Sequence, residues 1–282
     1  KRTFRPRFFR VISRSFIAVI ICSLFAFQLQ ATELKPWSRS LYSIDLRGSC
    51  LLQQFDKLDT KCATLNRSEL DGFYNFSALG VLEDSTVELE FLASNTCDRG
   101  FNTNALRLTG RYFWLNDVVD DPVSLVTGLT VSKIFVSSRH NVSLFDHGGI
   151  ACEAHISIGK ENSCEEFWTS RAWGVLGLGV ADVGSPWLRA NLVWERNWWE
   201  IHQLRVFADS IWGFGHDRLR ICPSFHGYGS VNYQAIDVGV RYGYRLCNDA
   251  LLSVSYAYRV YGRNCPVNVN LVQFEICYPF GL

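Results

Sequence analysis

The last thirteen residues of the chain alternate between apolar and mixed side chains with a period of two. Apolar or aromatic residues occupy every second position: Val272, Phe274, Ile276, Tyr278, Phe280 and Leu282. The positions between them hold Gln273, Glu275, Cys277, Pro279 and Gly281. Because a β-strand turns successive side chains to opposite faces, this stretch predicts a strand with one fully apolar face and one mixed face. In water such a strand would promote aggregation, whereas lipid requires an apolar face.

The same alternation recurs through the chain and predicts an all-β fold of twelve strands. The predicted strands are residues 39–47, 72–82, 86–94, 105–115, 123–137, 149–159, 167–181, 187–196, 199–212, 230–246, 250–261 and 270–282. An even number of strands returns both ends of a closed barrel to the same side of a membrane. We therefore expect a single transmembrane antiparallel up-and-down β-barrel over residues 32–282, and a secreted β-sandwich is the competing fold.

The connections between these strands differ in length on the two sides of the predicted barrel. With the N-terminus in the periplasm, the outer loops would be 48–71, 95–104, 138–148, 182–186, 213–229 and 262–269. The periplasmic turns would be 83–85, 116–122, 160–166, 197–198 and 247–249. Long outer loops and short periplasmic turns are typical of bacterial outer-membrane barrels. The strand assignment did not impose this asymmetry, so it supports the barrel independently.

One hairpin allows the pairing of residues to be predicted. If residues 247–249 form a symmetric turn, Tyr242 faces Val254 on an apolar face, and Asp237 faces Arg259 on a polar face. A shift of the register by one residue would mix the two faces, so this pairing is strongly specified.

Two further features of the strands are predicted from the same pattern. A symmetric turn after the third predicted strand places Glu88 opposite Arg111. The least regular strand is 199–212, because Glu200 and His202 share a face with apolar residues. We expect that strand to contain a bulge or to lie partly in the membrane interface.

The start of the chain has the pattern of a secretory signal peptide. Residues 1–14 contain six basic and no acidic residues, an apolar run of 12 residues follows at 16–27, and a small residue, Ala31, ends the segment. A helix needs about 20 residues to cross a bilayer, so we expect residues 1–31 to be a cleaved leader rather than a retained anchor. Its removal takes six of the 28 basic and none of the 27 acidic residues, which leaves a net charge of about −5. This charge does not favour nucleic acid as a partner.

The closing strand resembles the C-terminal signature of bacterial outer-membrane β-barrel proteins. It has alternating hydrophobic residues and a bulky last residue, although the usual terminal aromatic residue is displaced to Phe280, two positions before Leu282. In those proteins the signature is recognised by the barrel-insertion machinery. The resemblance therefore implies a Gram-negative cell outer membrane as the location, with outer-membrane lipid and the insertion machinery as partners. It does not identify a particular activity.

Charged residues on the mixed faces of the strands are predicted to line the lumen. They are Asp45, Arg47, Glu88, Glu90, Arg107, Arg111, Glu153, Arg171, Arg189, Glu195, Asp237, Arg241, Arg245, Arg259 and Glu275. One interpretation is an arginine ladder that guides anionic solutes through a narrow pore. The other is an ion-pair network that holds the shape of a structural, surface-exposed envelope protein. The nearly equal numbers of basic and acidic residues favour the network, and twelve strands are too few for a wide pore.

An enzyme and a surface receptor are the alternatives to a pore or a structural protein. His155-Ile156-Ser157 resembles the H-x-S motif of outer-membrane phospholipase A, and residues two apart on a strand share a face. In that family the pair faces lipid, whereas here it shares a face with Glu153 and is predicted to point inward. The chain is therefore predicted not to be an enzyme, with a barrel-embedded lipid hydrolase that uses Ser157 and His155 as the alternative.

An adhesin or receptor would act through the predicted outer loops 48–71 and 213–229. Metal and cofactor sites are not expected, because the loop histidines His202, His216 and His226 lack the spacing of metal ligands.

Nine cysteines follow the predicted leader, and none of them forms a C-x-x-C motif. Six lie in or near the predicted outer loops and are candidates for disulfides: Cys50, Cys62, Cys97, Cys152, Cys222 and Cys265. Cys164, Cys247 and Cys277 are predicted at the periplasmic rim. An odd number implies either one free thiol or a bond to another chain, and the alternative is that most are unpaired thiols. The cysteine content resembles that of chlamydial outer envelopes, which implies disulfide-linked envelope proteins as partners.

Overall fold

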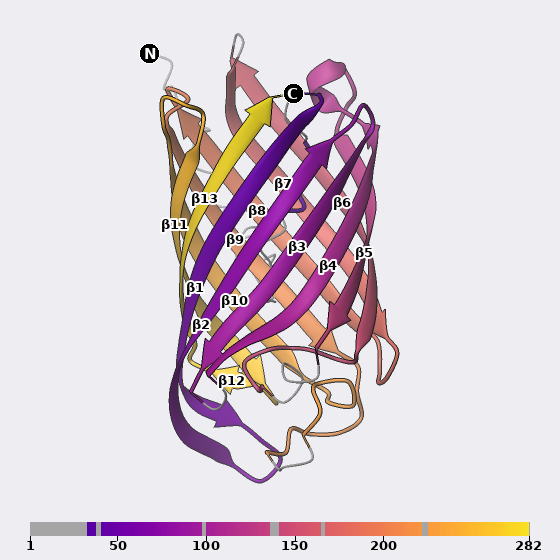
Figure 1. Cartoon of the computed structure of the whole chain (residues 1–282), viewed down its shortest axis with the longest axis vertical. Helices are drawn as coiled ribbons and strands as arrows, with labels where there is room; N and C mark the ends of the chain where they lie inside the picture. The colour runs from indigo at the N-terminus through magenta and orange to yellow at the C-terminus, as the bar shows by residue number, and fades with distance from the viewer. Residues whose placement is uncertain are drawn as a thin grey trace, which may run out of the picture.

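The computed structural model describes residues 33–37, 41–97, 100–135, 141–164, 167–221 and 225–281. Twelve long antiparallel strands close into a barrel, and a short strand, β12, pairs with the far end of β1 (Figure 1). The strands are β1 (Ser43–Asp59), β2 (Thr64–Val81), β3 (Ser85–Thr96), β4 (Gly100–Leu115), β5 (Ser124–Ile134), β6 (Ile150–Cys164), β7 (Phe167–Ala181), β8 (Trp187–Trp198), β9 (His202–Gly213), β10 (Gln234–Arg245), β11 (Leu251–Arg263), β12 (Pro266–Val267) and β13 (Asn270–Gly281), with a 3-10 helix η1 (Asp117–Val119) after β4. The predicted leader lies outside the described residues.

The barrel closes because β1 pairs with β2 on one side and with β13 on the other. Ser43 at the start of β1 lies opposite Gly281 at the end of β13, so the first and last strands begin and end at the same rim. We call this rim the terminal end and the opposite rim the loop end. Closure removes the unpaired sheet edges and satisfies the backbone groups of the strands without water.

The connections at the two rims differ in length only in part as the sequence predicts, because the loop end also has the short connections 60–63, 97–99 and 182–186. Turns at the terminal end include 82–84 and 199–201, whereas the loop end carries 135–149, 214–233 and 264–269. The predicted register of the last hairpin is confirmed, because Tyr242 pairs with Val254 and Asp237 with Arg259. The antiparallel up-and-down order is confirmed as well, and apart from β12 each long strand pairs with the next one along the chain.

The predicted pairing of Glu88 with Arg111 is wrong by two residues. Glu88 pairs with Thr109, and Arg111 pairs with Thr86. The strands continue closer to the turn than predicted, and the register shifts once between Leu92 and Ala93. Because the error is an even number of residues, both Glu88 and Arg111 keep the inward face that the pattern predicts.

The predicted outer loop 48–71 is also wrong, because most of it is strand. β1 continues to Asp59 and β2 begins at Thr64, so the connection is only residues 60–63. The hairpin projects beyond the rest of the barrel at the loop end (Figure 1). Inward side chains explain the extension, since Phe55 and Leu58 have no exposed surface and join the apolar cluster at this rim.

The bulge expected in the strand 199–212 is absent from its described register. β9 pairs without a shift with both β8 and β10. Glu200 belongs to the preceding turn, where its φ is 58°, so it does not disturb the strand. His202 lies at the terminal rim, and its Nδ1 is 2.7 Å from the hydroxyl of Tyr242.

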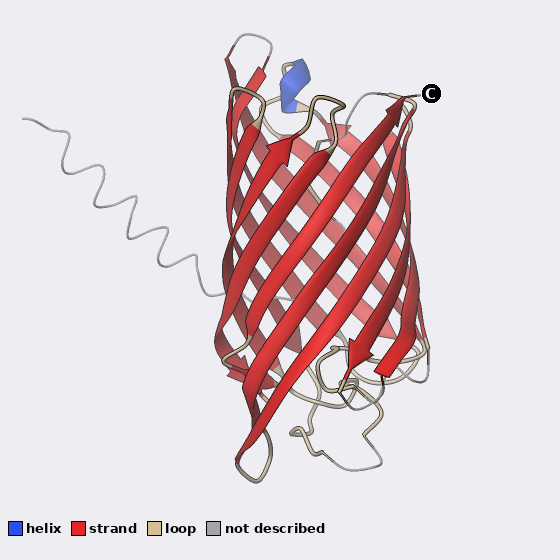
Figure 2. Cartoon of the chain, turned by 60° about the vertical axis from the view of Figure 1, so that its left-hand side comes forward, coloured by secondary structure: helices blue, strands red, loops and turns tan. Residues whose placement is uncertain are grey.

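The outward faces of the strands form an apolar belt. On β6 and β7 the outward side chains Ile156, Ile158, Leu176 and Leu178 are 44 to 54% exposed. The side chains between them face the lumen and are buried, as the alternating burial along both strands shows. The same pattern recurs on the other long strands, which form a continuous cylinder (Figure 2). Such a surface is stable only against hydrocarbon, so the barrel spans a membrane. Among the described residues, no helix has the length and apolar character needed to cross a bilayer.

A charge placed on the belt is expected to destabilise the barrel according to its depth. Leu108 is 51% exposed at the middle of β4, and Leu82 is 50% exposed in a turn at the terminal rim. Leu108→Arg should lower the free energy of unfolding by about 2–4 kcal/mol and Leu82→Arg by about 1 kcal/mol or less, because only the first puts a guanidinium in hydrocarbon. Urea titration of the protein folded in lipid vesicles measures both, and equal effects would contradict the membrane placement.

Candidate functional site

The lumen contains chain segments that do not belong to the wall. The N-terminal segment, residues 33–37, lies inside the barrel toward the terminal end. Side chains from residues 141–149, 214–221 and 225–233 pack into the lumen at the loop end, where they join strand residues in a buried apolar cluster. A central cavity lies between them. These three features form the candidate site.

The N-terminal segment bridges the lumen from wall to wall. Arg111 on β4 donates from Nη1 to the backbone oxygen of Glu33 at 3.1 Å. Arg241 on β10 donates to the carboxylate of the same residue. In the ring of twelve long strands, β4 and β10 are six strands apart in either direction, so they are opposite walls. A single residue thus connects the two sides of the barrel.

Further contacts fix the rest of the segment. The Ser157 hydroxyl on β6 donates to the backbone oxygen of Leu34 at 2.7 Å. Trp37 donates from Nε1 to Asp117 Oδ1 at 2.7 Å, at the turn that contains η1. The ring of Trp37 meets the ring of Trp173 edge to face, with centroids 5.7 Å apart. The segment is therefore held by directed contacts along its length.

The carboxylate of Glu33 lies between two arginines from neighbouring strands. Arg205 Nη1 on β9 is 2.7 Å from Glu33 Oε1, and Arg241 Nη1 donates to the same oxygen. On the other side Lys35 Nζ is 3.4 Å from Oε2. Burial by itself would raise the pKa of Glu33, but the charges of Arg205 and Arg241 hold this pKa well below its usual value. Glu33 is therefore ionised at neutral pH.

Most of the predicted lumen arginines are paired with acidic residues of the wall. Arg47 Nη1 is 3.4 Å from Glu88 Oε1, and Arg259 contacts Asp237 through two bonds of 2.8 and 2.9 Å. Further wall pairs are Arg47–Glu275, Arg171–Glu161, Arg189–Glu153, Arg205–Glu195 and Arg241–Glu275. Such pairs hold neighbouring strands in a fixed register and leave little net charge along the lumen.

Glu90, Arg245 and Arg107 have other surroundings than these ion pairs. Glu90 accepts a hydrogen bond of 3.0 Å from Asn75 rather than from an arginine. Arg245 lines a polar vestibule of about 390 Å³ at the terminal end, together with Glu33. Nη1 of Arg107 is buried without a hydrogen-bond partner among the described residues, and this side chain lines the central cavity. Arg107 thus forms no ion pair among the described residues, although Glu90 lies directly opposite it on β3.

The central cavity has a volume of about 70 Å³ and a mainly apolar lining. Its apolar walls include Leu51, Phe73, Leu92, Phe207 and Leu271. A space of this size holds only a few water molecules.

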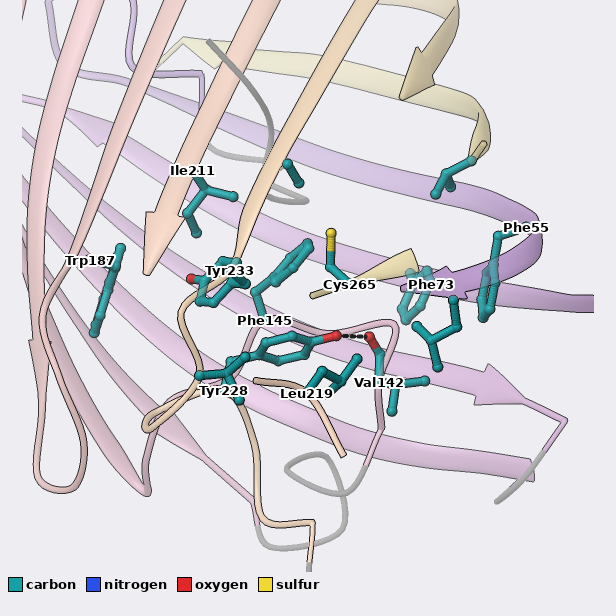
Figure 3. Close-up of a cluster of buried hydrophobic side chains, with 14 of the residues drawn as sticks. Phe55, Phe73, Val142, Phe145, Trp187, Ile211, Leu219, Tyr228, Tyr233 and Cys265 are labelled. Atoms are coloured by element: carbon teal, nitrogen blue, oxygen red, sulfur yellow. Dashed lines mark hydrogen bonds between the residues drawn. The ribbon is translucent and has the colours of Figure 1, made fainter. Parts of the chain in front are cut away.

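The loop plug consists of Val142, Phe145, Leu219, Tyr228 and Tyr233, all at least 95% buried (Figure 3). The rings of Phe145, Tyr228 and Tyr233 lie with each pair of centroids 4.9 Å apart. The Tyr228 hydroxyl donates to the backbone oxygen of Val142 at 2.7 Å. Mutual ring packing of this kind stabilises the loops against one another, so the plug is a packed element at the loop end of the lumen.

His147 joins the loop plug to the wall. Its ring stacks on Trp187 with centroids 4.0 Å apart, and Nε2 is 2.9 Å from the hydroxyl of Tyr233. Burial lowers the pKa of His147 to about 3, because the charged ring would lose its hydration. The residue is therefore neutral when the plug is packed.

The proposed hydrolase pair is not arranged as a nucleophile and its base. His155 and Ser157 share the inward face of β6 and are buried. The Ser157 hydroxyl donates to Leu34, and neither ring nitrogen of His155 has a hydrogen-bond partner among the described residues. A serine nucleophile needs a base within hydrogen-bond reach, so this geometry gives the alternative no support.

No disulfide joins any two cysteines within the described residues, and Cys222 lies outside them. Cys62, Cys97 and Cys265 lie in connections at the loop end. Cys50 does not, because it belongs to β1, and Cys152 is part of β6. The loop position predicted for Cys50 is thus wrong, since the strand is longer than expected. The predicted disulfides and disulfide-linked partners stay predictions.

Neither Arg205 nor the N-terminal segment is among the residues that the sequence pattern predicts for the lumen. The signal for Arg205 was present, because Gln203, Arg205 and Asp209 alternate with the apolar face of β9. The role of Glu33 has no signal in its local sequence, since a single acid before the first strand is equally compatible with solvent. The inward course of loop 214–233 was missed as well, because loops usually lie at the surface.

These features define the class: a transmembrane β-barrel of the outer-membrane type with an occupied lumen. No protein-family model matches the chain, and no curated protein matches its sequence. Solved structures do match. An outer membrane channel from Pseudomonas putida F1 aligns with 89% of this chain and 100% of its own, at 12% identity and a TM-score of 0.61. The NanC porin aligns with 83% of this chain and 98% of its own, at 10% identity and a TM-score of 0.55. At these identities the likeness establishes the outer-membrane barrel fold.

The two classes of lumen arginine should differ in their contribution to stability. Arg259→Gln leaves Asp237 buried without its cation and should lower the free energy of unfolding by about 3–5 kcal/mol. Arg107→Gln removes a cation that forms no ion pair among the described residues. This change should alter the free energy of unfolding by about 1 kcal/mol or less. Urea unfolding of both variants in detergent micelles tests this difference. Equal losses would show that Arg107 is paired in solution.

Acidification should loosen the loop plug before it affects the N-terminal segment. His147 has a folded pKa of about 3 and a usual value of 6.5, so unpacking takes up a proton. Above pH 6.5, the usual pKa of histidine, His147 is neutral in both states and the packed state is fully favoured. Below pH 6.5 the packed state loses about 1.4 kcal/mol per pH unit, until the pH reaches the folded pKa of about 3. The usual pKa of a glutamate is 4.5, and the pKa of Glu33 is lowered in the folded protein. The contacts of Glu33 are therefore lost only below pH 4.5.

Hydrogen exchange measures this pH dependence at one amide. The N–H of Tyr228 donates to the backbone oxygen of Asp146 at 2.7 Å. Its protection factor, corrected for the intrinsic exchange rate, should fall between about pH 6.5 and about pH 5 in the native protein. In His147→Gln it should be independent of pH over that interval. A constant protection factor in the native protein would contradict the prediction.

Proposed function

We propose that the chain is a narrow channel for small solutes across the outer membrane, closed at both ends by segments that can move. The observation that carries this proposal is that residues 33–37 and the loop plug, which belong to no long strand, occupy the two ends of the lumen. A barrel whose only function is structural can fill its lumen with wall side chains. Here the wall is a shell of paired charges, and removable segments occupy the space inside it.

The N-terminal segment is attached in a way that permits release. Its described residues belong to no strand, and they are held by side-chain contacts from the wall. If the leader is cleaved after Ala31, as the sequence predicts, the segment starts one residue before Glu33. A chain end can leave the lumen without breaking the ladder of the barrel. The vestibule at the terminal end provides space for this movement.

The solved structures with a similar fold support the same proposal as the contents of the lumen. Two of the matched solved structures are described as an outer membrane channel and as a porin. The ion pairs of the wall are compatible with a channel, because they hold the wall rigid while the segments move. The arrangement of His155 and Ser157 gives no reason to propose hydrolysis. A structural envelope role is the alternative, and it requires that the segments never leave.

Weakening the N-terminal segment should increase conductance. Glu33→Gln removes the charge that Arg205 and Arg241 hold, so the segment should leave the lumen more often. We expect the open probability of single channels in planar bilayers to rise by about tenfold, because charge-assisted bonds of this kind contribute about 1.5–3 kcal/mol. Glu83→Gln is the matched control, since it makes the same chemical change in an exposed turn at the same rim.

The same recordings decide between the channel and the structural role. The control variant should behave like the native protein, with rare current steps. If the native protein, Glu33→Gln and a variant that lacks residues 33–37 are all silent in the bilayer, the channel proposal is wrong. Unboiled gel migration confirms that each variant is a folded barrel.

A further inference from the structure

The wall around Glu33 is built so that two guanidinium groups each direct one nitrogen to the same point. Arg205 donates from Nε and Nη2 to Glu195 Oε1 at 3.2 and 3.0 Å, and Arg241 donates from Nη2 to Glu275 Oε1 at 2.8 Å. The remaining Nη1 atoms of both arginines meet at Glu33 Oε1. The wall acids therefore orient the arginines, and a carboxylate that is not part of the wall completes the site.

An apolar cluster adjoins this pair of nitrogens, because the guanidinium carbon of Arg205 lies 5.2 Å from the ring centroid of Trp173. Leu34, the residue after Glu33, is 7% exposed and packs in a cluster with Trp173, Val175 and Val193. Its backbone oxygen accepts the hydrogen bond from Ser157. The occupant of the site is thus a carboxylate next to a branched aliphatic group.

We infer that this site binds a small organic acid with an apolar body, and that Glu33 and Leu34 occupy it as an intramolecular competitor. The inference rests on the proposed function, because the acid would be the solute that passes through the lumen. Its carboxylate would accept from the Nη1 atoms of Arg205 and Arg241. Its carbon skeleton would take the place of the Leu34 side chain.

The exchange requires that Glu33 and the solute differ little in the free energy with which they bind the site. A ligand tethered by a short flexible segment acts at an effective concentration of about millimolar. A solute at a similar concentration can therefore replace Glu33 without any stronger contact. Binding is selective for an anion, because a neutral ligand would leave the buried Nη1 donors of Arg205 and Arg241 unpaired.

Beyond the site, the lumen continues with apolar and cationic groups. Phe207, the next inward residue after Arg205 on β9, contacts the apolar cluster around Leu34 and also lines the central cavity. Arg107 lies four residues from Arg111 along β4, about 13 Å further toward the loop end. Its unpartnered Nη1 gives an anion a second binding position. The order of these groups matches the passage of an acid with an apolar body.

Calorimetry on the full chain folded in detergent micelles tests the inference. The probe is 4-methylpentanoate, a carboxylate with the branched skeleton of a leucine side chain. The dissociation constant should be at least about tenfold lower for Glu33→Gln than for the native protein, because the competitor has lost its charge. Glu83→Gln, which changes an exposed acid at the same rim, should bind like the native protein.

Three further arms test the chemistry of the ligand on the Glu33→Gln background. The neutral 4-methylpentanamide should not bind, acetate should bind more weakly than the probe, and inorganic phosphate should not compete. Combining Arg205→Gln with Glu195→Gln keeps the wall neutral and should abolish binding. Arg196→Gln is the control, because Arg196 lies beside Glu195 on the opposite, exposed face of β8.

Each result decides for or against the inference. If Glu33→Gln does not bind the probe, or binds the amide with equal affinity, the inference is wrong. If acetate binds as tightly as the probe, the apolar part of the inference is wrong. Binding is measured without any membrane potential, so it is independent of conductance. If the probe binds while all variants are silent in bilayers, the site stands and the channel fails. If channels open but the probe does not bind, the channel stands and the site is wrong.

Discussion

The constraint on which this structure depends is that hydrocarbon cannot form hydrogen bonds. Every strand in the bilayer must therefore find both of its neighbours within the chain, and β1 completes the ring by pairing with β2 and β13. Closure in turn separates two environments. The outward residues face lipid and are apolar, whereas the inward residues are shielded from bulk water and carry most of their charges in pairs. The arginines and acids of the lumen follow from this separation.

Paired charges give the wall a rigidity that its contents do not share. A bidentate contact such as Arg259 with Asp237 joins two neighbouring strands, and it must be broken for the strands to separate. Residues 33–37 and the loop plug occupy the lumen without belonging to that network of strands. Arg205 and Arg241 participate in both systems, because each binds a wall acid with one edge and Glu33 with Nη1. A rigid wall with replaceable contents is what the proposed channel requires.

The fold was largely predictable from the sequence because a strand repeats every two residues. Strand positions, the inward face of Glu88 and Arg111, and the register of Tyr242 with Val254 all follow from that period. Two wrong predictions concern features that a period of two residues does not determine, namely the register between strands and the point at which a strand ends. The pairing of Glu88 was wrong by two residues because an even shift preserves the faces. The extent of β1 was underestimated because inward residues near the loop end, such as Phe55, are apolar as well.

By itself the sequence determined the barrel, its apolar belt and the charged character of its lumen, since these depend on the neighbours of each residue along a strand. Only the tertiary structure decided which charges meet. Glu33 and Arg241 are 208 positions apart, and nothing local to either residue specifies their contact. It exists because closure brings opposite walls within reach of one short segment. The folding of Phe145 and Tyr228 into the lumen has the same cause, because the closed ring provides the apolar interior that these rings fill.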